Sequence, residues 1–184
     1  LRLVETHDAL DAQSDELVAQ INADIEAVDR KPMAVTPIIL RLTGDAPTTL
    51  HELINPQTLV NFDLDADGTA ERRPWVNPDT AILVWDPENT GKITSGKQLF
   101  GNMTFFMLFS DGYRALDTLD NNRDGQLTGD ELDGLALWTD ANANGISDEG
   151  EVTPIAQTPI RALATNMTGN EQGHPLAHHG VTLD

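Results

Sequence analysis

The chain has 184 residues, with 30 acidic side chains against 11 basic ones and a formal net charge of −19. This balance argues against nucleic acid and anionic membrane surfaces as partners, because no basic stripe is present to neutralise phosphates. Cysteine is absent, which excludes disulfides and thiolate chemistry. No apolar run approaches membrane-spanning length, so we expect no membrane insertion.

Residues 1–32 predict an amphipathic helix. Apolar side chains recur there at three-, four- or seven-residue spacing, and Lys31-Pro32 ends the pattern. They are Leu10, Leu17, Ile21, Ile25 and Val28. The apolar stripe needs a partner surface, either the rest of this chain or another protein, and packing within the chain is favoured. Residues 33–184 have a different character and form the second predicted domain.

Short apolar runs bounded by Gly, Pro, Asn and Asp follow the helix. We predict strands at residues 38–42, 60–62 and 81–85. A dense apolar block at 103–109 predicts a buried helix, and residues 113–119 predict a short amphipathic one.

Residues 120–131 match a complete calcium loop of the EF-hand type. Oxygen side chains stand at positions one, three and five, with glycine at six and glutamate at twelve. Calcium is a hard cation that takes roughly six to eight oxygen ligands, and this pattern supplies them in sequence order. The predicted ligands are Asp120, Asn122, Asp124, the backbone carbonyl of Gln126, and Glu131.

A second loop with the same pattern occupies residues 140–151. Its predicted ligands are Asp140, Asn142, Asn144, the backbone carbonyl of Ile146, and Glu151. Ordinary turn chemistry explains the Asn and Gly residues, but not a closing glutamate at the same offset twice. The short spacing leaves room for one helix over residues 128–138, so the loops are expected to share it. Pro154 cannot continue a helix, so the second loop is expected to lead into a strand.

A weaker loop precedes this pair. Asp63, Asp65 and Asp67 stand at positions one, three and five, with glycine at six. Proline occupies position twelve, so Glu71 or a residue from elsewhere would have to complete the ligand shell. A metal site is favoured here over a structural Asp-rich turn.

Residues 86–91 have the same outline without a closing carboxylate. Lys97 and Gln98 stand where that carboxylate is needed, and an ammonium group opposes a divalent cation, so we interpret this loop as degenerate. The Asp86-Pro87 bond inside it is the one reactive bond in the sequence. An aspartate carboxyl can attack its own peptide bond, although Asp86 is more readily a ligand or a turn residue.

The remaining candidates are weak. His174, His178 and His179 form a His-rich tail, but Gly and Pro around them break the helix that would aim them at a metal, so a solvated loop is favoured. No glycine-rich phosphate loop and no Gly-x-Ser-x-Gly elbow is present.

These loops are part of a longer sequence pattern that covers more than half of the chain. Its elements are Phe62 to Gly68, Trp75, Ala81 to Trp85, Leu99-Phe100-Gly101, Asp111-Gly112-Tyr113, Asp120 to Glu131, Trp138, and Asp140 to Glu151. Their order and spacing resemble a calcium-binding module of bacterial RTX-type exoproteins. The resemblance implies calcium as the bound ion and a secreted or cell-surface location in bacteria.

Some members of that family are self-processing modules. They cut an Asp-Pro bond when calcium binds, and the new Asp end can link to a lysine. The matching bond here is Thr36-Pro37, so the carboxyl nucleophile is absent, and Arg41 and Thr43 replace the first two acidic residues of the following motif. This departure implies a module that keeps the calcium scaffold without the reaction.

We therefore predict an α+β fold: a compact module with tandem EF-hand-like calcium loops sharing one helix, short strands, and an N-terminal amphipathic helix. The expected function is calcium binding that folds and stabilises a secreted or surface protein, without catalysis. The alternative is calcium-dependent autocatalytic cleavage at Asp86-Pro87. An interaction module of the dockerin kind ranks lower, because dockerin loops are spaced by a full helix pair.

Overall fold

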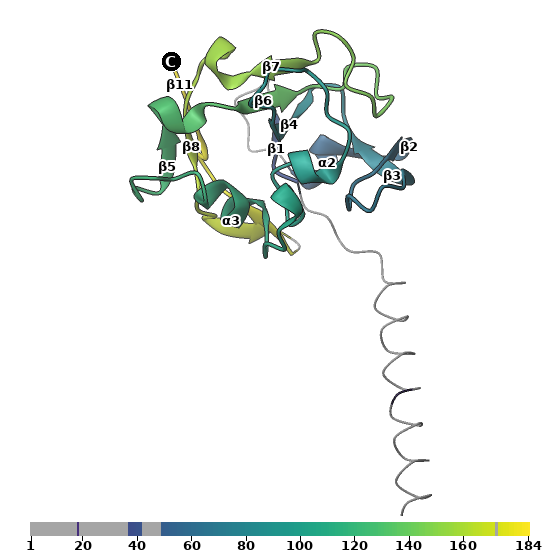
Figure 1. The fold of residues 1–184 in the computed structure, drawn as a ribbon, viewed down its shortest axis with the longest axis horizontal. Coiled ribbons are helices and arrows are strands. Elements are labelled where there is room, and N and C mark those ends of the chain that lie inside the picture. Colours follow the sequence, from purple (N-terminus) through teal and green to yellow (C-terminus); the bar gives the residue numbers. More distant parts are fainter. Residues whose placement is uncertain (1–17, 19–36, 42–48, 172) are drawn as a thin grey trace, which may run out of the picture. The chain divides into compact units, whose positions relative to one another are not determined.

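The structure, a computed structural model, describes residues 18, 37–41, 49–171 and 173–184 (Figure 1). The chain divides into two compact units, residues 1–34 and 35–184, and the second is described here by itself. The predicted helix over residues 1–32, apart from Val18, lies outside the described residues, as do Thr36 and Thr43. The predictions made above for these residues are therefore not tested by the structure.

The largest sheet has four antiparallel strands in the order β1-β4-β6-β7. These strands are β1 (Ile39–Arg41), β4 (Thr80–Trp85), β6 (Leu135–Trp138) and β7 (Val152–Pro154). All of β6 and all of β4 except Trp85 are buried, which explains why both read as continuous apolar runs.

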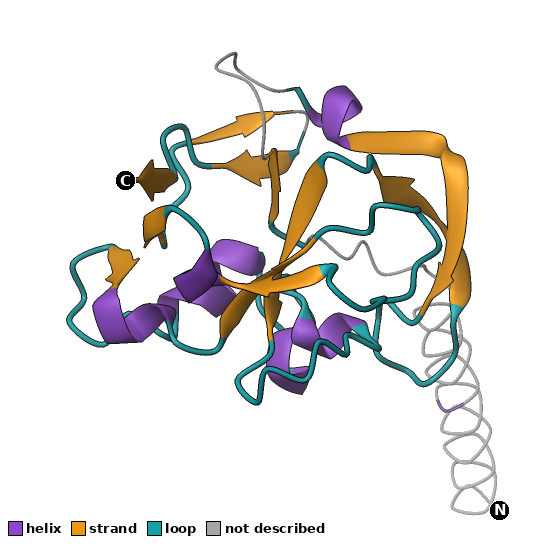
Figure 2. Cartoon of the chain, turned by 90° about the horizontal axis from the view of Figure 1, so that it is seen from above, coloured by secondary structure: helices purple, strands orange, loops and turns teal. Residues whose placement is uncertain are grey.

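Three smaller sheets surround this one (Figures 1 and 2). β2 (Ile54–Phe62) and β3 (Glu71–Val76) form a hairpin. A three-stranded sheet has the order β11-β8-β5, built from β11 (Val181–Leu183), β8 (Ile160–Ala164) and β5 (Gln126–Thr128). The last pair is β9 (Gly169–Glu171) with β10 (His174–Leu176).

Helical structure is short throughout the described residues. The α-helices are α2 (Leu50–Leu53) and α3 (Gly112–Asp117). The 3-10 helices are η1 (Gly96–Gln98), η2 (Thr104–Phe106), η3 (Gly129–Leu132) and η4 (Ile155–Gln157). No helix in this part of the chain is long and apolar enough to cross a membrane.

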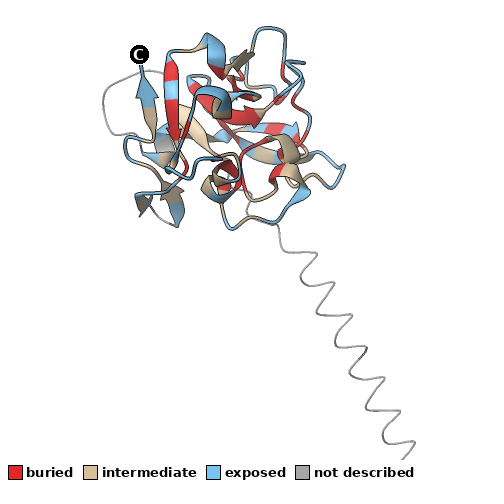
Figure 3. Cartoon of the chain, turned by 60° about the vertical axis from the view of Figure 1, so that its left-hand side comes forward, coloured by how far each residue is buried: buried red, intermediate tan, exposed pale blue. Residues whose placement is uncertain are grey.

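The central strands supply two separate hydrophobic cores, because alternate residues of a strand point to opposite faces. One core includes Ala81, Leu83, Leu135 and Leu137, and it packs with α3, β5 and β8. The other includes Ile82, Val84, Ala136 and Trp138, and it packs with the β2–β3 hairpin. Buried residues accordingly concentrate along the strands of the central sheet, while many of the loops are exposed (Figure 3). The loop at Asp120 is therefore attached to the first core, and the loops at Asp63 and Asp140 are attached to the second.

The predicted α+β fold with EF-hand-like loops sharing one helix is wrong. The described chain is mostly β-sheet, and residues 128–138 form η3 and then strand β6 instead of one helix. Gly134 adopts a left-handed conformation, with φ of 83°, directly before β6. The apolar run Leu135–Trp138 then pairs with β4 on one side and β7 on the other. These pairings override the helix expected from the loop spacing.

The predicted buried helix at residues 103–109 is also wrong. Only η2 forms there, and Phe105 and Phe106 have left-handed φ values of 57° and 58°. Phe105 packs against Trp85 and Phe100, whereas Phe106 and Leu108 are 65% and 79% exposed. The predicted strands at 60–62 and 81–85 lie within β2 and β4, and β1 covers residues 39–41 of the run at 38–42.

The loop that contains Asp63 is anchored by a close backbone approach at Gly96. The Gly96 amide donates to the carbonyl oxygen of Asp63 at 2.7 Å, and a Cβ at Gly96 would lie 1.7 Å from the Leu64 carbonyl oxygen. We predict that Gly96→Ala lowers the free energy of unfolding by about 3 kcal/mol or more, because backbone must move. Chemical denaturation monitored by tryptophan fluorescence measures this.

Gly169→Ala is the matched control. The nearest atom to a Cβ there is Leu176 Cδ1 at 3.2 Å, the end of a flexible side chain. Its cost should stay below about 1 kcal/mol. Equal unfolding midpoints for the two variants would show that the close backbone contact between Gly96 and Leu64 does not exclude a side chain at position 96.

Candidate metal centre

The four loops with calcium-type sequences share one hydrogen bond. In each, the carboxylate at position one accepts the backbone N–H of the glycine at position six. The N···Oδ2 distances are 3.2 Å for Gly68 and Asp63, 2.8 Å for Gly91 and Asp86, 2.9 Å for Gly125 and Asp120, and 2.8 Å for Gly145 and Asp140. The weaker loops therefore have the same local closure as the complete ones.

The loops also share their backbone conformation. Position six is a left-handed glycine in each, with φ of 93° at Gly68, 64° at Gly91, 86° at Gly125 and 75° at Gly145. Position four is left-handed as well, with φ of 61° at Ala66, 49° at Asn89, 62° at Arg123 and 53° at Ala143. Non-glycine residues rarely adopt this conformation, so its recurrence at one position indicates a common loop structure.

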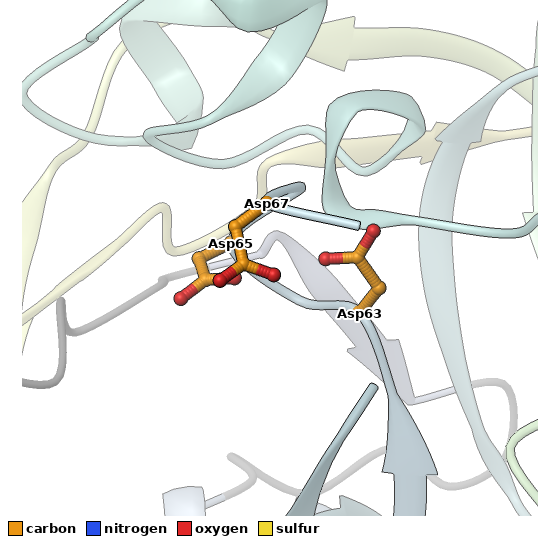
Figure 4. A group of neighbouring side chains, drawn as sticks. All are labelled: Asp63, Asp65 and Asp67. Atoms are coloured by element: carbon orange, nitrogen blue, oxygen red, sulfur yellow. The ribbon is translucent and has the colours of Figure 1, made fainter. Parts of the chain in front are cut away.

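The Asp63 loop brings its three predicted ligands together (Figure 4). One carboxylate oxygen from each of Asp63, Asp65 and Asp67 lies within 4.8 Å of the other two. Asp63 Oδ1 and Asp65 Oδ1 are buried without a hydrogen-bond partner. Three converging carboxylates repel one another unless a cation lies between them, so this cluster could hold a metal ion.

Glu71 does not belong to that cluster. It begins β3, pairs with Phe62 in the hairpin, and lies 3.7 Å from Arg73 Nη2 through Oε2. The same Oε2 atom is buried and has no hydrogen bond. Among the described residues, only Asp63, Asp65 and Asp67 form a group of three acidic or histidine ligands at this spacing.

Three carboxylates are buried in the described part of the chain, and each is the first residue of a loop. Asp86, Asp120 and Asp140 are 5%, 8% and 0% exposed. Burying a carboxylate is costly unless hydrogen bonds compensate it. Each of these side chains accepts at least three hydrogen bonds, mostly from backbone amides of its own loop.

The first complete loop lies between α3 and η3. Its closing Glu131 reaches back to the loop start, where Oε1 accepts the amides of Asn121 and Asn122 at 2.9 and 3.2 Å. Glu131 Oε2 also accepts the Thr128 amide at 3.1 Å. Asp120 and Glu131 thus hold the two ends of the loop by hydrogen bonds to its backbone. The side chain of Asn166, from outside the loop, lies next to Gly125.

The second complete loop closes in the same way. Glu151 Oε1 accepts the Ala141 amide at 3.0 Å, and Oε2 accepts the Asp148 amide at 3.0 Å. The side-chain amides of Asn142 and Asn144 both donate to Asp148 Oδ2, at 2.8 and 2.9 Å. These two hydrogen bonds hold the pKa of Asp148 below its ordinary value, and the bond from Asn142 contributes most.

The Asp86 loop and the second complete loop meet at the eighth position of each. The Ile93 amide donates to Ser147 Oγ at 2.9 Å, and both residues are buried. The Ser147 hydroxyl in turn donates to the carbonyl oxygen of Ile93, at 3.5 Å. The second complete loop is thus joined at position eight to the degenerate loop.

Two contributors to the site are absent from the sequence predictions. Asp148 occupies position nine, where calcium loops often bind through water, so the loop pattern could have identified it. Trp75 donates its indole N–H to Asp140 Oδ2 at 2.6 Å across 65 residues, and no local signal predicts this contact. His174, His178 and His179 are exposed and join no group of three ligands among the described residues.

These features define a β-rich module with a candidate metal centre made of Asp- and Asn-rich loops. The family model of the SPM domain matches residues 38–181, so the chain belongs to the SPM domain family. The chain is also similar to the iron-regulated protein FrpA of Neisseria meningitidis serogroup C, at 31% identity over 132 residues. That match covers 69% of this chain and 12% of FrpA, so the chain spans a small part of that relative.

The hydrogen bonds to Asp148 give a testable pH dependence. Because its pKa is lowered in the folded state, its stabilising contribution is present above the unfolded pKa, near 3.8, and is lost as pH falls through the folded value. We predict that Asn142→Ala raises the pKa of Asp148 in the metal-free protein. An NMR titration of the side-chain carboxyl carbon measures it.

The matched control for that titration is Asn121→Ala. Asn121 is an exposed asparagine in the first loop and does not contact Asp148. An unchanged Asp148 titration in both variants would mean that the side-chain amide of Asn142 does not stabilise the carboxylate.

Proposed function

We propose that this module binds calcium ions in its loops and that binding stabilises its folded state. The observation that carries the proposal is the hydrogen bond from the glycine at position six to the carboxylate at position one, repeated in all four loops. This bond fixes one carboxylate oxygen. The other oxygen has no hydrogen bond at Asp63 and accepts only the Asn144 amide, at 3.1 Å, at Asp140. Oxygen-rich loops closed by glutamate suit a hard cation such as calcium.

The two complete loops, at Asp120 and Asp140, are the main proposed sites. The proposed ligands are those predicted from the sequence, with Asp148 added at position nine through water. The loop at Asp63 is proposed as a further site because its three carboxylates converge. The Asp86 loop is proposed as structural, since it lacks a closing carboxylate and both oxygens of Asp86 accept hydrogen bonds from Thr90 and Gly91.

The physical effect of calcium would be linkage between binding and folding. An ion that binds only the folded state stabilises it by RT ln(1 + [L]/Kd), which is roughly 2.7 kcal/mol per site at a hundredfold excess over Kd. The whole chain carries a net charge of −19, and ions would also reduce repulsion between its carboxylates. Stabilisation on this scale is a large part of a typical domain's stability.

We further propose that the module acts without catalysis, as part of a secreted or surface protein in bacteria. Support for the location comes from the similarity to FrpA, named as an iron-regulated protein, and from the dependence of such loops on abundant calcium. Another protein is a proposed partner for residues 1–32. Against cleavage at Asp86-Pro87, both Asp86 carboxylate oxygens are hydrogen-bonded to residues 90 and 91.

Thermal unfolding with calcium and with a chelator tests the binding proposal. We predict a higher midpoint in calcium, and a smaller calcium-dependent shift in Glu131→Gln and Glu151→Gln, because each loses a bidentate ligand. Glu149→Gln is the matched control, since Glu149 is exposed in the second loop but stands outside the ligand positions. Equal midpoints with and without chelator would contradict the proposal.

The absence of self-processing is tested separately. Purified protein incubated with millimolar calcium should remain a single band on a denaturing gel. Fragments that end at Asp86, formed with calcium and not with chelator, and abolished by Asp86→Ala, would establish the catalytic alternative instead.

A further inference from the structure

Trp75 makes a direct contact with the second complete loop from another part of the fold. Its indole Nε1 donates to Asp140 Oδ2 at 2.6 Å, and the two side chains are 4% and 0% exposed. The same Oδ2 accepts the Gly145 amide at 2.8 Å. Oδ1 accepts only the longer hydrogen bond from the Asn144 amide, at 3.1 Å.

This distribution of donors orients the carboxylate. Two short hydrogen bonds hold Oδ2 on the protein side, so Oδ1 is the oxygen left to bind an ion. Hydrogen bonds to a charged acceptor are stronger than neutral ones, and the buried setting strengthens them further. Trp75 thus has the geometry of a positioning residue for the first ligand of this loop.

Trp75 also belongs to the hairpin that carries the Asp63 loop. Its ring packs against Phe62 and Trp138 at centroid distances of 5.4 and 5.5 Å, and Phe62 directly precedes Asp63. The hairpin and the second loop touch again at Gly145, where a Cβ would lie 2.8 Å from Val60 Cβ. The first complete loop has no part in this cluster, since its Leu127 packs in the other core.

We propose that Trp75 positions Asp140 for calcium and couples the second loop to the Asp63 loop, so that the two sites load cooperatively. This inference rests on the proposed calcium binding and adds a regulation of it. Movement of the Asp140 carboxylate onto an ion is transmitted through the indole to the β2–β3 hairpin. Occupancy of the Asp63 loop stabilises the same hairpin from its other end, and such coupling is reciprocal.

The test uses the two glycine amides as separate reporters of loop occupancy. Gly125 and Gly145 donate to Asp120 and Asp140, so their NMR resonances should shift when the respective loop binds calcium. Trp75→Phe removes the indole donor and keeps an aromatic ring. We expect calcium Kd at Gly145 to rise roughly tenfold or more, as for loss of a charged hydrogen bond, with Kd at Gly125 unchanged.

Trp138→Phe is the matched control. Trp138 lies in the same aromatic cluster, and its Nε1 has no hydrogen-bond partner, so the variant loses ring volume without losing a bond. Benzothienylalanine incorporated at position 75 replaces the indole N–H by sulfur and retains the shape. It should reproduce the Trp75→Phe effect even where the smaller phenyl ring destabilises the fold.

Coupling is measured with Asp65→Asn, which weakens the Asp63 loop alone. We expect it to raise the Kd at Gly145 roughly fivefold or more, and to have a smaller effect when Trp75→Phe is also present. An equal effect of Trp75→Phe and Trp138→Phe would overturn the positioning role. An unchanged Gly145 Kd in Asp65→Asn would overturn the coupling. If neither glycine responded to calcium, the proposed function itself would fail.

Discussion

A buried carboxylate held by the amide of a glycine five residues later recurs in this fold, and the arrangement of the loops depends on it. At Asp140 the side chain is completely buried, so it has to be compensated by the protein. Backbone amides supply part of that compensation without adding positive charge. The remaining negative charge is what makes these loops suited to a cation.

The central sheet distributes the loops between two cores. Alternate residues of β4 and β6 face opposite sides, and the two faces pack with different loops. The loop at Asp120 is continuous with β5 and the core under α3, whereas those at Asp63 and Asp140 share the aromatic cluster of Phe62, Trp75 and Trp138. Calcium bound on either side would therefore stabilise a different part of the module.

Loop geometry could be predicted from the sequence because it is local. The residue types at positions one and six determine the hydrogen bond, and the left-handed glycines follow from it. The architecture could not be predicted in the same way, since Leu135–Trp138 becomes a strand only by pairing with β4 and β7. The apolar composition of residues 103–109 also predicted a buried helix that does not form. There the Thr104 hydroxyl is buried and donates to backbone carbonyls, while Phe106 is exposed.

Calcium binding by the metal-free protein can be measured directly. Calorimetric titration should show saturable binding of at least two calcium ions per chain, one for each complete loop, with weaker binding of magnesium, which demands a stricter octahedral geometry. Absence of saturable calcium binding, or equal binding of both ions, would contradict the proposal that these loops are calcium sites.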